Sequence, residues 1–123
     1  MKLIKILFFI VNIAFIIFYI YPGSIFGCLF YKDCLIQPQL TKDFIISSNH
    51  FYAFLIISLC GFQIFIQNYK NLIILYLSSS VILELSHLII PNRSFQFSDM
   101  FGNIAGVIVS FAIIKLINYW RKK

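Results

Sequence analysis

Four long apolar stretches alternate with polar segments along the chain. They cover residues 3–21, 50–67, 71–90 and 98–119. A helix needs roughly 20 apolar residues to cross a hydrocarbon core of about 30 Å, and each stretch approaches that length, the second only barely. Because only helices and closed barrels satisfy their backbone hydrogen bonds in lipid, the pattern predicts an all-α polytopic membrane protein. We expect a four-helix transmembrane bundle in a single domain, residues 1–123.

Turn-forming residues mark the ends of these stretches. Pro22 closes the first stretch and opens a long outer loop, residues 22–49. A tight turn of the length found between antiparallel helices is expected at residues 68–71. Pro91 disfavours a helical conformation at the residue before it, so the third helix should end there. Ser98 is expected to cap the fourth helix.

Composition supports the membrane assignment. The chain is 61% hydrophobic and 11% charged, whereas soluble domains are only about half apolar. Tyrosine and tryptophan rings are typical anchors at membrane interfaces. The residues near span ends that fit this role are Tyr19, Tyr21, Tyr31, Tyr52, Tyr69, Tyr119 and Trp120.

The net charge of +6 indicates orientation and not a nucleic-acid partner, since the basic residues form no patch. Four crossings would put both termini on one side of the membrane. The basic residues on that side are Lys2, Lys5, Lys70, Lys115, Arg121, Lys122 and Lys123. Those on the other side are Lys32, Lys42 and Arg93. Because basic residues favour the cytoplasm, we predict cytoplasmic termini, with loop 22–49 and the 91–97 connection outside.

The first stretch resembles the core of a signal peptide, because Lys2 and Lys5 precede an apolar run. It is longer than a usual signal core, and no small-x-small cleavage site follows it directly, so an uncleaved helix is expected. Residues 25–28 form a distorted lipoprotein box with a bulky Phe26, which favours lipidation of Cys28 only weakly.

Two cysteines of the outer loop, Cys28 and Cys34, lie six positions apart. In an oxidising compartment that spacing permits a disulfide. The alternative is a pair of small hydrophobic residues in a segment that grazes the membrane. The sequence leaves both open.

Polar residues gather near the end of the third stretch and the start of the fourth. Ser80, Glu84 and His87 follow an i, i+4, i+7 spacing, so they line one face of a helix. A carboxylate facing lipid costs on the order of 3 kcal/mol, so Glu84 should face the bundle interior. The fourth helix carries a matching face of Asp99, Asn103, Gly106 and Ser110. We expect the two faces to meet, with Gly106 and Ser110 serving helix packing.

A shallow outward-facing pocket is predicted where these faces approach the outer loop. Arg93 lies in the connection, where its planar guanidinium could reach Asp99, Glu84 or an anionic ligand in a bidentate fork. His50 opens the second stretch at the same depth. The ligand-binding candidates are His50, Glu84, His87, Arg93, Asp99 and Asn103.

The string ELSHLIIPNRSFQFSDMFGNIAG, residues 84–106, resembles a signature of the VanZ-like family of small bacterial membrane proteins. The residues that carry the resemblance are Glu84, His87, Pro91, Arg93, Asp99, Asn103 and Gly106, together with His50 and Phe51. The chain departs from the family pattern at four positions. Asn49 stands where the family commonly has a basic residue, and His87 where it has glutamine. Asn92 stands where it has glycine, and Ser110 where it has a second glycine.

The resemblance covers residues 50–110, about half of the chain. It implies a multi-pass protein of the bacterial cytoplasmic membrane. The family is named for a member linked to teicoplanin resistance. It supplies a location in the cell envelope more than a reaction.

No soluble-enzyme signature competes, because the sequence lacks a Gly-rich phosphate loop, a Cys-x-x-Cys pair and a nucleophile elbow. Ser80, Glu84 and His87 share one helix and have no identifiable oxyanion donor, which argues against a hydrolase triad. Glu84 and His87 also resemble half of a di-metal motif, but matching ligands are few. We therefore predict no metal and no cofactor, and leave open whether any reaction is catalysed.

Two functions fit these observations. Arg93, with His50 and Asn103, could bind an anionic envelope molecule such as a lipid-linked phosphate or a cell-wall precursor, while Glu84 and Asp99 orient the arginine or exchange protons. Alternatively, Glu84 and Arg93 form an ion pair that only locks the helices of a structural or accessory subunit with a membrane protein partner. A proton-coupled carrier is less favoured, since the sequence shows no internal repeat or broken helix.

Overall fold

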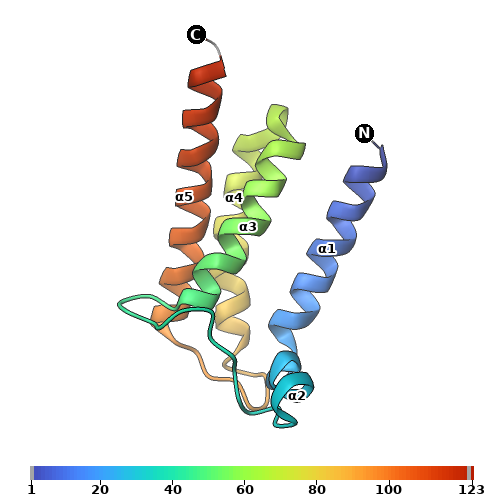
Figure 1. Ribbon diagram of the computed structural model, residues 1–123, viewed down its shortest axis with the longest axis vertical. Helices are drawn as coiled ribbons and strands as arrows, with labels where there is room; N and C mark the ends of the chain where they lie inside the picture. Colours follow the sequence, from blue (N-terminus) through green and yellow to red (C-terminus); the bar gives the residue numbers. More distant parts are fainter. Residues whose placement is uncertain (1, 122) are drawn as a thin grey trace.

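The computed structural model describes residues 2–121 and 123, and its regular structure over that range is helical. The elements in chain order are α1 (Lys2–Ile20), α2 (Ile25–Tyr31), α3 (Ser48–Ile64), the short 3₁₀ helix η1 (Ile66–Asn68), α4 (Tyr69–Ser86) and α5 (Phe97–Arg121). The four long helices lie side by side, and α1 leans away from the other three toward its N-terminus (Figure 1). Both chain ends lie at one end of the molecule, and α2 lies with the loops at the other.

Two helices are long and apolar enough to cross a membrane by themselves, namely α1 and the Phe97–Trp120 part of α5. α3 and the η1–α4 segment meet this requirement only as a pair, which would make a third span, and they join at a 104° bend. α3 has 17 residues, which rise about 25 Å against a hydrocarbon thickness of about 30 Å. The chain is therefore an all-α membrane protein, while the four crossings stay a prediction.

Small residues of α5 bring its backbone against α3. A Cβ added at Gly106 would lie 2.5 Å from the Phe51 carbonyl oxygen and 2.8 Å from the Leu55 nitrogen, so only glycine fits there. One turn further, the Ser110 and Ser58 hydroxyls lie 2.6 Å apart. This face of α5 was predicted to meet α4. Gly106 and Ser110 instead pack on α3, because that helix offers the backbone that small residues can approach.

The buried core lies between α3, α4 and α5. Phe54, Phe62 and Val107 are fully buried. Tyr76 of α4 meets Phe62 edge to face, with ring centroids 5.9 Å apart. Large rings with this geometry fill a helical interface and fix the rotation of each helix within it.

The third apolar stretch forms a shorter helix than predicted. α4 ends at Ser86 and not at residue 90. Two 3.1 Å bonds of the tighter i→i+3 kind follow, from the Leu88 N–H to the Leu85 carbonyl and from the Ile89 N–H to the Ser86 carbonyl. Pro91 disfavours a helical conformation before it, so the chain tightens into turns over its last apolar residues.

Ser98 does not cap α5, in contrast to the prediction. α5 begins one residue earlier, at Phe97, and the Gln96 carbonyl accepts the Asp99 N–H at 3.1 Å. The Gln96 N–H donates to Oε1 of Glu84, also at 3.1 Å. A buried carboxylate from α4, and not a local hydroxyl, thus satisfies the backbone just before α5.

The connections that flank α3 also differ from the prediction. η1 replaces the tight turn expected at residues 68–71, because the chain leaves the helix at Phe65. The long loop 22–49 contains α2, whose N-terminus is capped by the Ser24 hydroxyl accepting the Gly27 N–H at 3.0 Å. With 7 residues, α2 spans too few turns for its period to be visible in the sequence.

Candidate functional site

Tyr19 of α1 is the hub of a buried polar cluster. Its hydroxyl donates to Oε2 of Glu84 at 2.7 Å and accepts from Nδ2 of Asn103 at 2.6 Å. The same oxygen lies 2.9 Å from Nδ1 of His50. These partners come from α4, α5 and α3, so one side chain joins all four long helices.

Tyr19 does not lie at the membrane interface as a lipid anchor, so that prediction is wrong. The residue is only 7% exposed and points inward. A tyrosine near the end of an apolar span looks the same in sequence whether it faces lipid headgroups or a buried carboxylate. Its position level with Glu84 depends on how α1 is rotated against α4, which no local pattern records.

The tautomer of His50 follows from its neighbours. Asn103 donates from Nδ2 to the Ser80 carbonyl at 3.3 Å, which turns its Oδ1 toward His50. That oxygen lies 3.1 Å from Nδ1 of His50 and can only accept, so Nδ1 carries a proton. The other ring nitrogen, Nε2, faces Oδ2 of Asp99 at 3.3 Å.

Glu84 and His87 form a second carboxylate–imidazole contact on the opposite side of Tyr19. Glu84 is fully buried, and its Oε1 lies 3.3 Å from Nδ1 of His87. Nε2 of His87 donates to the Tyr19 main-chain carbonyl at 3.1 Å. The imidazole also stacks on the Tyr19 ring, with centroids 5.0 Å apart. The two histidines therefore flank Tyr19, each paired with one carboxylate.

Arg93 does not pair with Glu84 or Asp99, so the predicted ion pair is wrong for the described part of the chain. Its guanidinium donates to main-chain carbonyls at the end of α1, those of Tyr21 at 3.1 Å, Tyr19 at 3.4 Å and Phe18 at 3.5 Å. The last carbonyls of a helix lack intrahelical partners and carry partial negative charge, which attracts a cation. Burial lowers the pKa of Arg93, but an arginine stays protonated in proteins.

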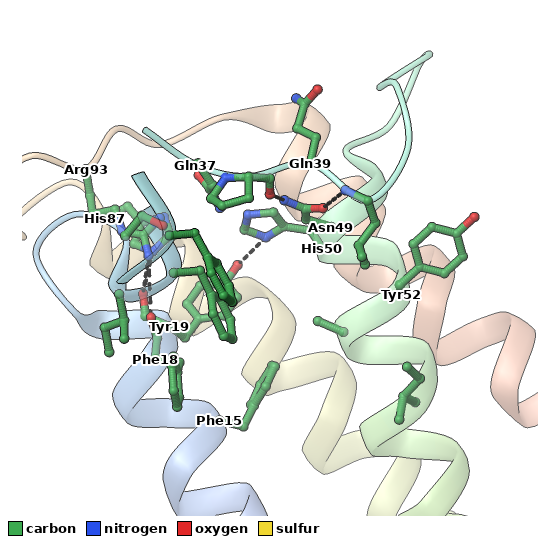
Figure 2. Close-up of a pocket in the computed structure, with 18 residues that line it drawn as sticks. Phe15, Phe18, Tyr19, Gln37, Gln39, Asn49, His50, Tyr52, His87 and Arg93 are labelled. Atoms are coloured by element: carbon green, nitrogen blue, oxygen red, sulfur yellow. Dashed lines mark hydrogen bonds between the residues drawn. The ribbon is translucent and has the colours of Figure 1, made fainter. Parts of the chain in front are cut away.

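A cavity of about 580 Å³ lies between α1, α2, the Gln37–Leu40 segment and α3. Figure 2 shows His87 and Arg93 at one side of it and His50 with Tyr19 beside them. The remaining wall is mostly apolar and aromatic, with Phe15, Phe18, Phe26, Phe30, Tyr52 and Ile56. The cavity is therefore amphipathic, with its cationic and imidazole groups at one end.

The six predicted candidates divide between this cavity and the cluster behind it. His50, His87 and Arg93 line the cavity. Glu84, Asp99 and Asn103 lie behind His50 and Tyr19, where they hold those rings in place. The structure thus brings the six residues to one region but does not open all of them to one pocket.

Residues 37–40 of the long loop close one side of the cavity. Asn49 at the start of α3 donates to the Pro38 carbonyl at 2.6 Å and accepts the Leu40 N–H at 2.9 Å (Figure 2). A disulfide joins Cys28 of α2 to Cys34, and so ties α2 to the chain just before these residues. Asn49 was noted in the sequence only as a departure from the family pattern, and nothing there signalled its role as an anchor of the loop.

Comparison of the chain with known protein families, with curated proteins and with solved structures finds no match. The VanZ-like resemblance therefore stays an expectation from the sequence.

Proposed function

We propose that the chain is a VanZ-like protein of the bacterial cytoplasmic membrane whose outer cavity binds an anionic amphiphile, such as a lipid-linked phosphate or a cell-wall precursor. The proposal includes four membrane crossings and cytoplasmic termini. Its main support is the cavity, which combines a cationic end with apolar walls on a membrane protein.

The arrangement of the chain is consistent with this orientation. Both chain ends and the α3–α4 turn lie at one end of the molecule, and α2, the long loop and the α4–α5 connection lie at the other (Figure 1). Among the described residues, the basic ones at the first end are Lys2, Lys5, Lys70, Lys115, Arg121 and Lys123, and those at the second are Lys32, Lys42 and Arg93. Positive charge favours the cytoplasmic side, which puts the cavity near the outer leaflet.

The cavity is large and apolar enough to hold part of a lipid, and it is too large for a single free ion. Its volume of about 580 Å³ lies within the range of about 300–1,000 Å³ typical of small-molecule sites. Phe15, Phe18 and Ile56 would contact a hydrocarbon chain. The exposed Ile56 on α3 lies on the lipid-facing part of the wall, so a chain could enter sideways from the bilayer.

Arg93 is the group best placed to hold an anionic head. Its bonds to the end of α1 use Nε and Nη2. Nη1 makes no hydrogen bond to the described protein atoms, and it can donate two hydrogen bonds to a phosphate or carboxylate. The bonds to α1 fix the direction of the guanidinium, so the site is held ready for a ligand.

The experiment is lipid binding by native mass spectrometry of the protein in detergent. The probes are a polyprenyl monophosphate, phosphatidylglycerol and phosphatidylcholine. Ala53 lines the cavity, whereas Ala112 lies on the exposed face of α5. Ala53→Phe should fill the cavity and lower the bound fraction of the anionic probes several-fold, and Ala112→Phe should leave it at the wild-type level. Equal binding by both variants would reject the cavity as the lipid site.

Arg93→Lys sharpens the test of the head group. Lysine keeps the charge but loses the planar fork, so binding of the anionic probes should weaken while binding of phosphatidylcholine stays the same. Uniform loss for all three lipids would indicate a collapsed α1 and not a lost anion contact.

A structural or accessory role is the second candidate, and one observation favours it. Every buried side-chain polar atom of the described residues has a hydrogen-bond partner inside the protein. A cluster that is fully satisfied can serve to hold helices together without any ligand. In that case the paired replacement Glu84→Gln with His87→Gln should preserve both abundance and the phenotype of the wild-type gene.

A further inference from the structure

Two acceptor atoms face each other in the contact between α3 and α5. Nδ1 of His50 carries its proton toward Asn103, so Nε2 presents a lone pair in the neutral ring. The nearest charged atom to that nitrogen is Oδ2 of Asp99, 3.3 Å away. A lone pair and a carboxylate repel each other unless a positive centre lies between them. This centre is either a proton or a metal cation.

Glu84 brings a second carboxylate to the same imidazole ring, with its Oε2 3.9 Å from Nδ1 of His50. One ligand atom from each of His50, Glu84 and Asp99 can be chosen so that all three lie within 4.8 Å of one another. The three residues come from α3, α4 and α5, and the His50 and Asp99 side chains are 7% and 15% exposed. Their convergence from separate helices is a property of the fold and not of one local acidic run.

We infer that His50, Glu84 and Asp99 form a binding site for one divalent first-row transition metal ion. Imidazole nitrogen and carboxylate oxygen, with no sulfur, are ligands typical of Zn²⁺, Fe²⁺ and Mn²⁺. Such ions lie about 2.0–2.2 Å from their ligand atoms, so binding an ion would draw the three side chains closer together.

The surrounding hydrogen bonds have the form of a metal site's supporting contacts. A metal-bound histidine commonly donates its other N–H to an oxygen, which fixes the ring. Asn103 supplies that oxygen to His50 at 3.1 Å. Tyr19 donates to Oε2 of Glu84 at 2.7 Å and leaves the second lone pair of that oxygen free. A divalent cation would also balance the buried carboxylate of Glu84 and the partly buried one of Asp99, which Arg93 does not neutralise.

This site is independent of the proposed lipid function. Glu84 and Asp99 do not line the cavity, and the inference needs no lipid. The two proposals are separated if Ala53→Phe loses lipid binding but keeps metal binding. They are also separated if Asp99→Asn loses metal binding but keeps lipid binding.

The experiment measures metal bound to the full chain purified in detergent without a histidine tag. The protein is treated with a chelator, dialysed against Zn²⁺ or Mn²⁺, and assayed by elemental analysis and titration calorimetry. We expect about one ion per wild-type chain. Asp99→Asn and His50→Gln should bind at least about ten-fold more weakly, and Asn103→Leu, which removes only the supporting oxygen, about 10–100-fold more weakly.

Asp33→Asn is the matched control, because Asp33 lies exposed in the outer loop and should not affect the site. Since a variant could lose metal by misfolding, helix content and elution in size-exclusion chromatography are compared for all of them. Co²⁺ absorption gives a second readout of the ligands, and its visible bands should change in His50→Gln. No stoichiometric ion in the wild type, or equal affinity in wild type and Asp99→Asn, would overturn the inference and leave a proton as the shared centre.

Discussion

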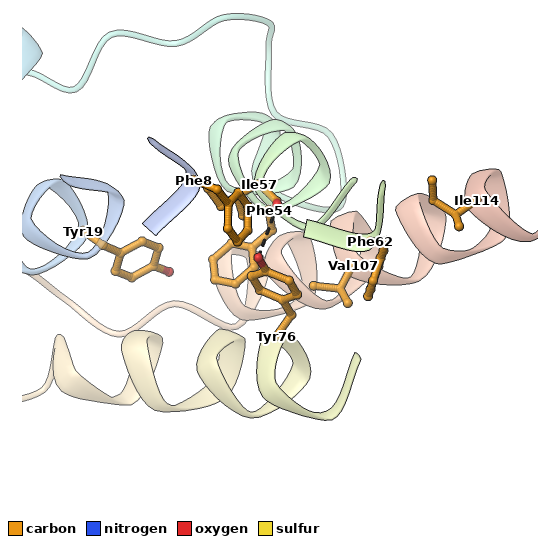
Figure 3. Packing of buried hydrophobic residues seen from close by; sticks show 8 residues of the cluster. All are labelled: Phe8, Tyr19, Phe54, Ile57, Phe62, Tyr76, Val107 and Ile114. Carbon is orange, nitrogen blue, oxygen red and sulfur yellow. Dashed lines mark hydrogen bonds between the residues drawn. The ribbon is translucent and has the colours of Figure 1, made fainter. Parts of the chain in front are cut away.

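The two ends of α1 attach to the bundle in different ways. Near its C-terminus, Tyr19 makes hydrogen bonds to three other helices. Near its N-terminus, Phe8 meets Phe65 through a tilted ring contact, with centroids 5.6 Å apart, and makes no polar bond from its side chain. Figure 3 shows the Phe8 and Tyr19 side chains of α1 reaching toward the core. One end is held by buried hydrogen bonds, and the other by aromatic packing and a cation–π contact, with Nζ of Lys5 5.3 Å from the Phe65 ring centroid.

This difference matters more in a membrane than in water. Lipid tails solvate an aromatic ring nearly as well as a protein core does, so apolar packing gives helices little drive to associate. A buried polar group has no such substitute in hydrocarbon. The polar end should therefore fix the depth and rotation of α1, while the aromatic end can separate at small cost.

The largest effect is expected for Glu84→Ala at the polar end. It removes the acceptor of Tyr19 and Gln96 and the partner of His87, and leaves the Tyr19 and His87 side chains buried. Breaking such a buried cluster should cost about 3–5 kcal/mol of folding free energy. Unfolding in mixed micelles with a denaturing detergent measures this cost. Stability within roughly 1 kcal/mol of wild type, the value for one exposed ion pair, would show that the cluster is not what holds the helices.

Tyr19→Phe should come next, with a loss of about 1–3 kcal/mol, because the deleted hydroxyl leaves Oε2 of Glu84 without its donor and removes one of the two acceptors of the buried Asn103 amide. Tyr76→Phe is the matched control. The Tyr76 hydroxyl donates to the Ile57 carbonyl at 3.4 Å, which is longer than any of the three hydrogen bonds of Tyr19, so its removal should cost less than Tyr19→Phe in the same unfolding titration. The reverse order would contradict the assignment of Tyr19 as the hub.

Phe8→Ala tests the aromatic end. The loss should be on the order of 1 kcal/mol, the value of an aromatic pair, because lipid can fill the space that the ring leaves. Labels near the N-termini of α1 and α4 should show a broader distance distribution by double electron–electron resonance, while labels beside Tyr19 should not. A loss larger than that of Tyr19→Phe would reverse the comparison.

The smallest effect is expected for Ser98→Ala. The hydroxyl contacts only Asp99 at 3.3 Å and caps no helix, so stability should change by less than about 0.5 kcal/mol. A helix cap at this position would instead cost about 1 kcal/mol. Thermal unfolding of the purified variant separates these values.

The sequence alone determined the helical class and the approximate extent of each long helix. Apolar run length and Pro22 act locally, so the ends of α1 and α5 lie within two residues of their predicted positions. The face of α4 that carries Ser80, Glu84 and His87 is also buried as a set, because a spacing of three or four residues fixes one side of a helix whatever it meets.

Only the tertiary structure decided which partner each polar group meets. Arg93 donates hydrogen bonds to carbonyls at the end of α1 and not to a carboxylate. The Tyr19 side chain points inward to Glu84, and Gly106 packs on α3 and not on α4. These outcomes depend on the relative rotation and shift of whole helices, to which many residues contribute at once. A local pattern specifies which face of a helix is polar, but the helix that faces it is set by the packing of all four.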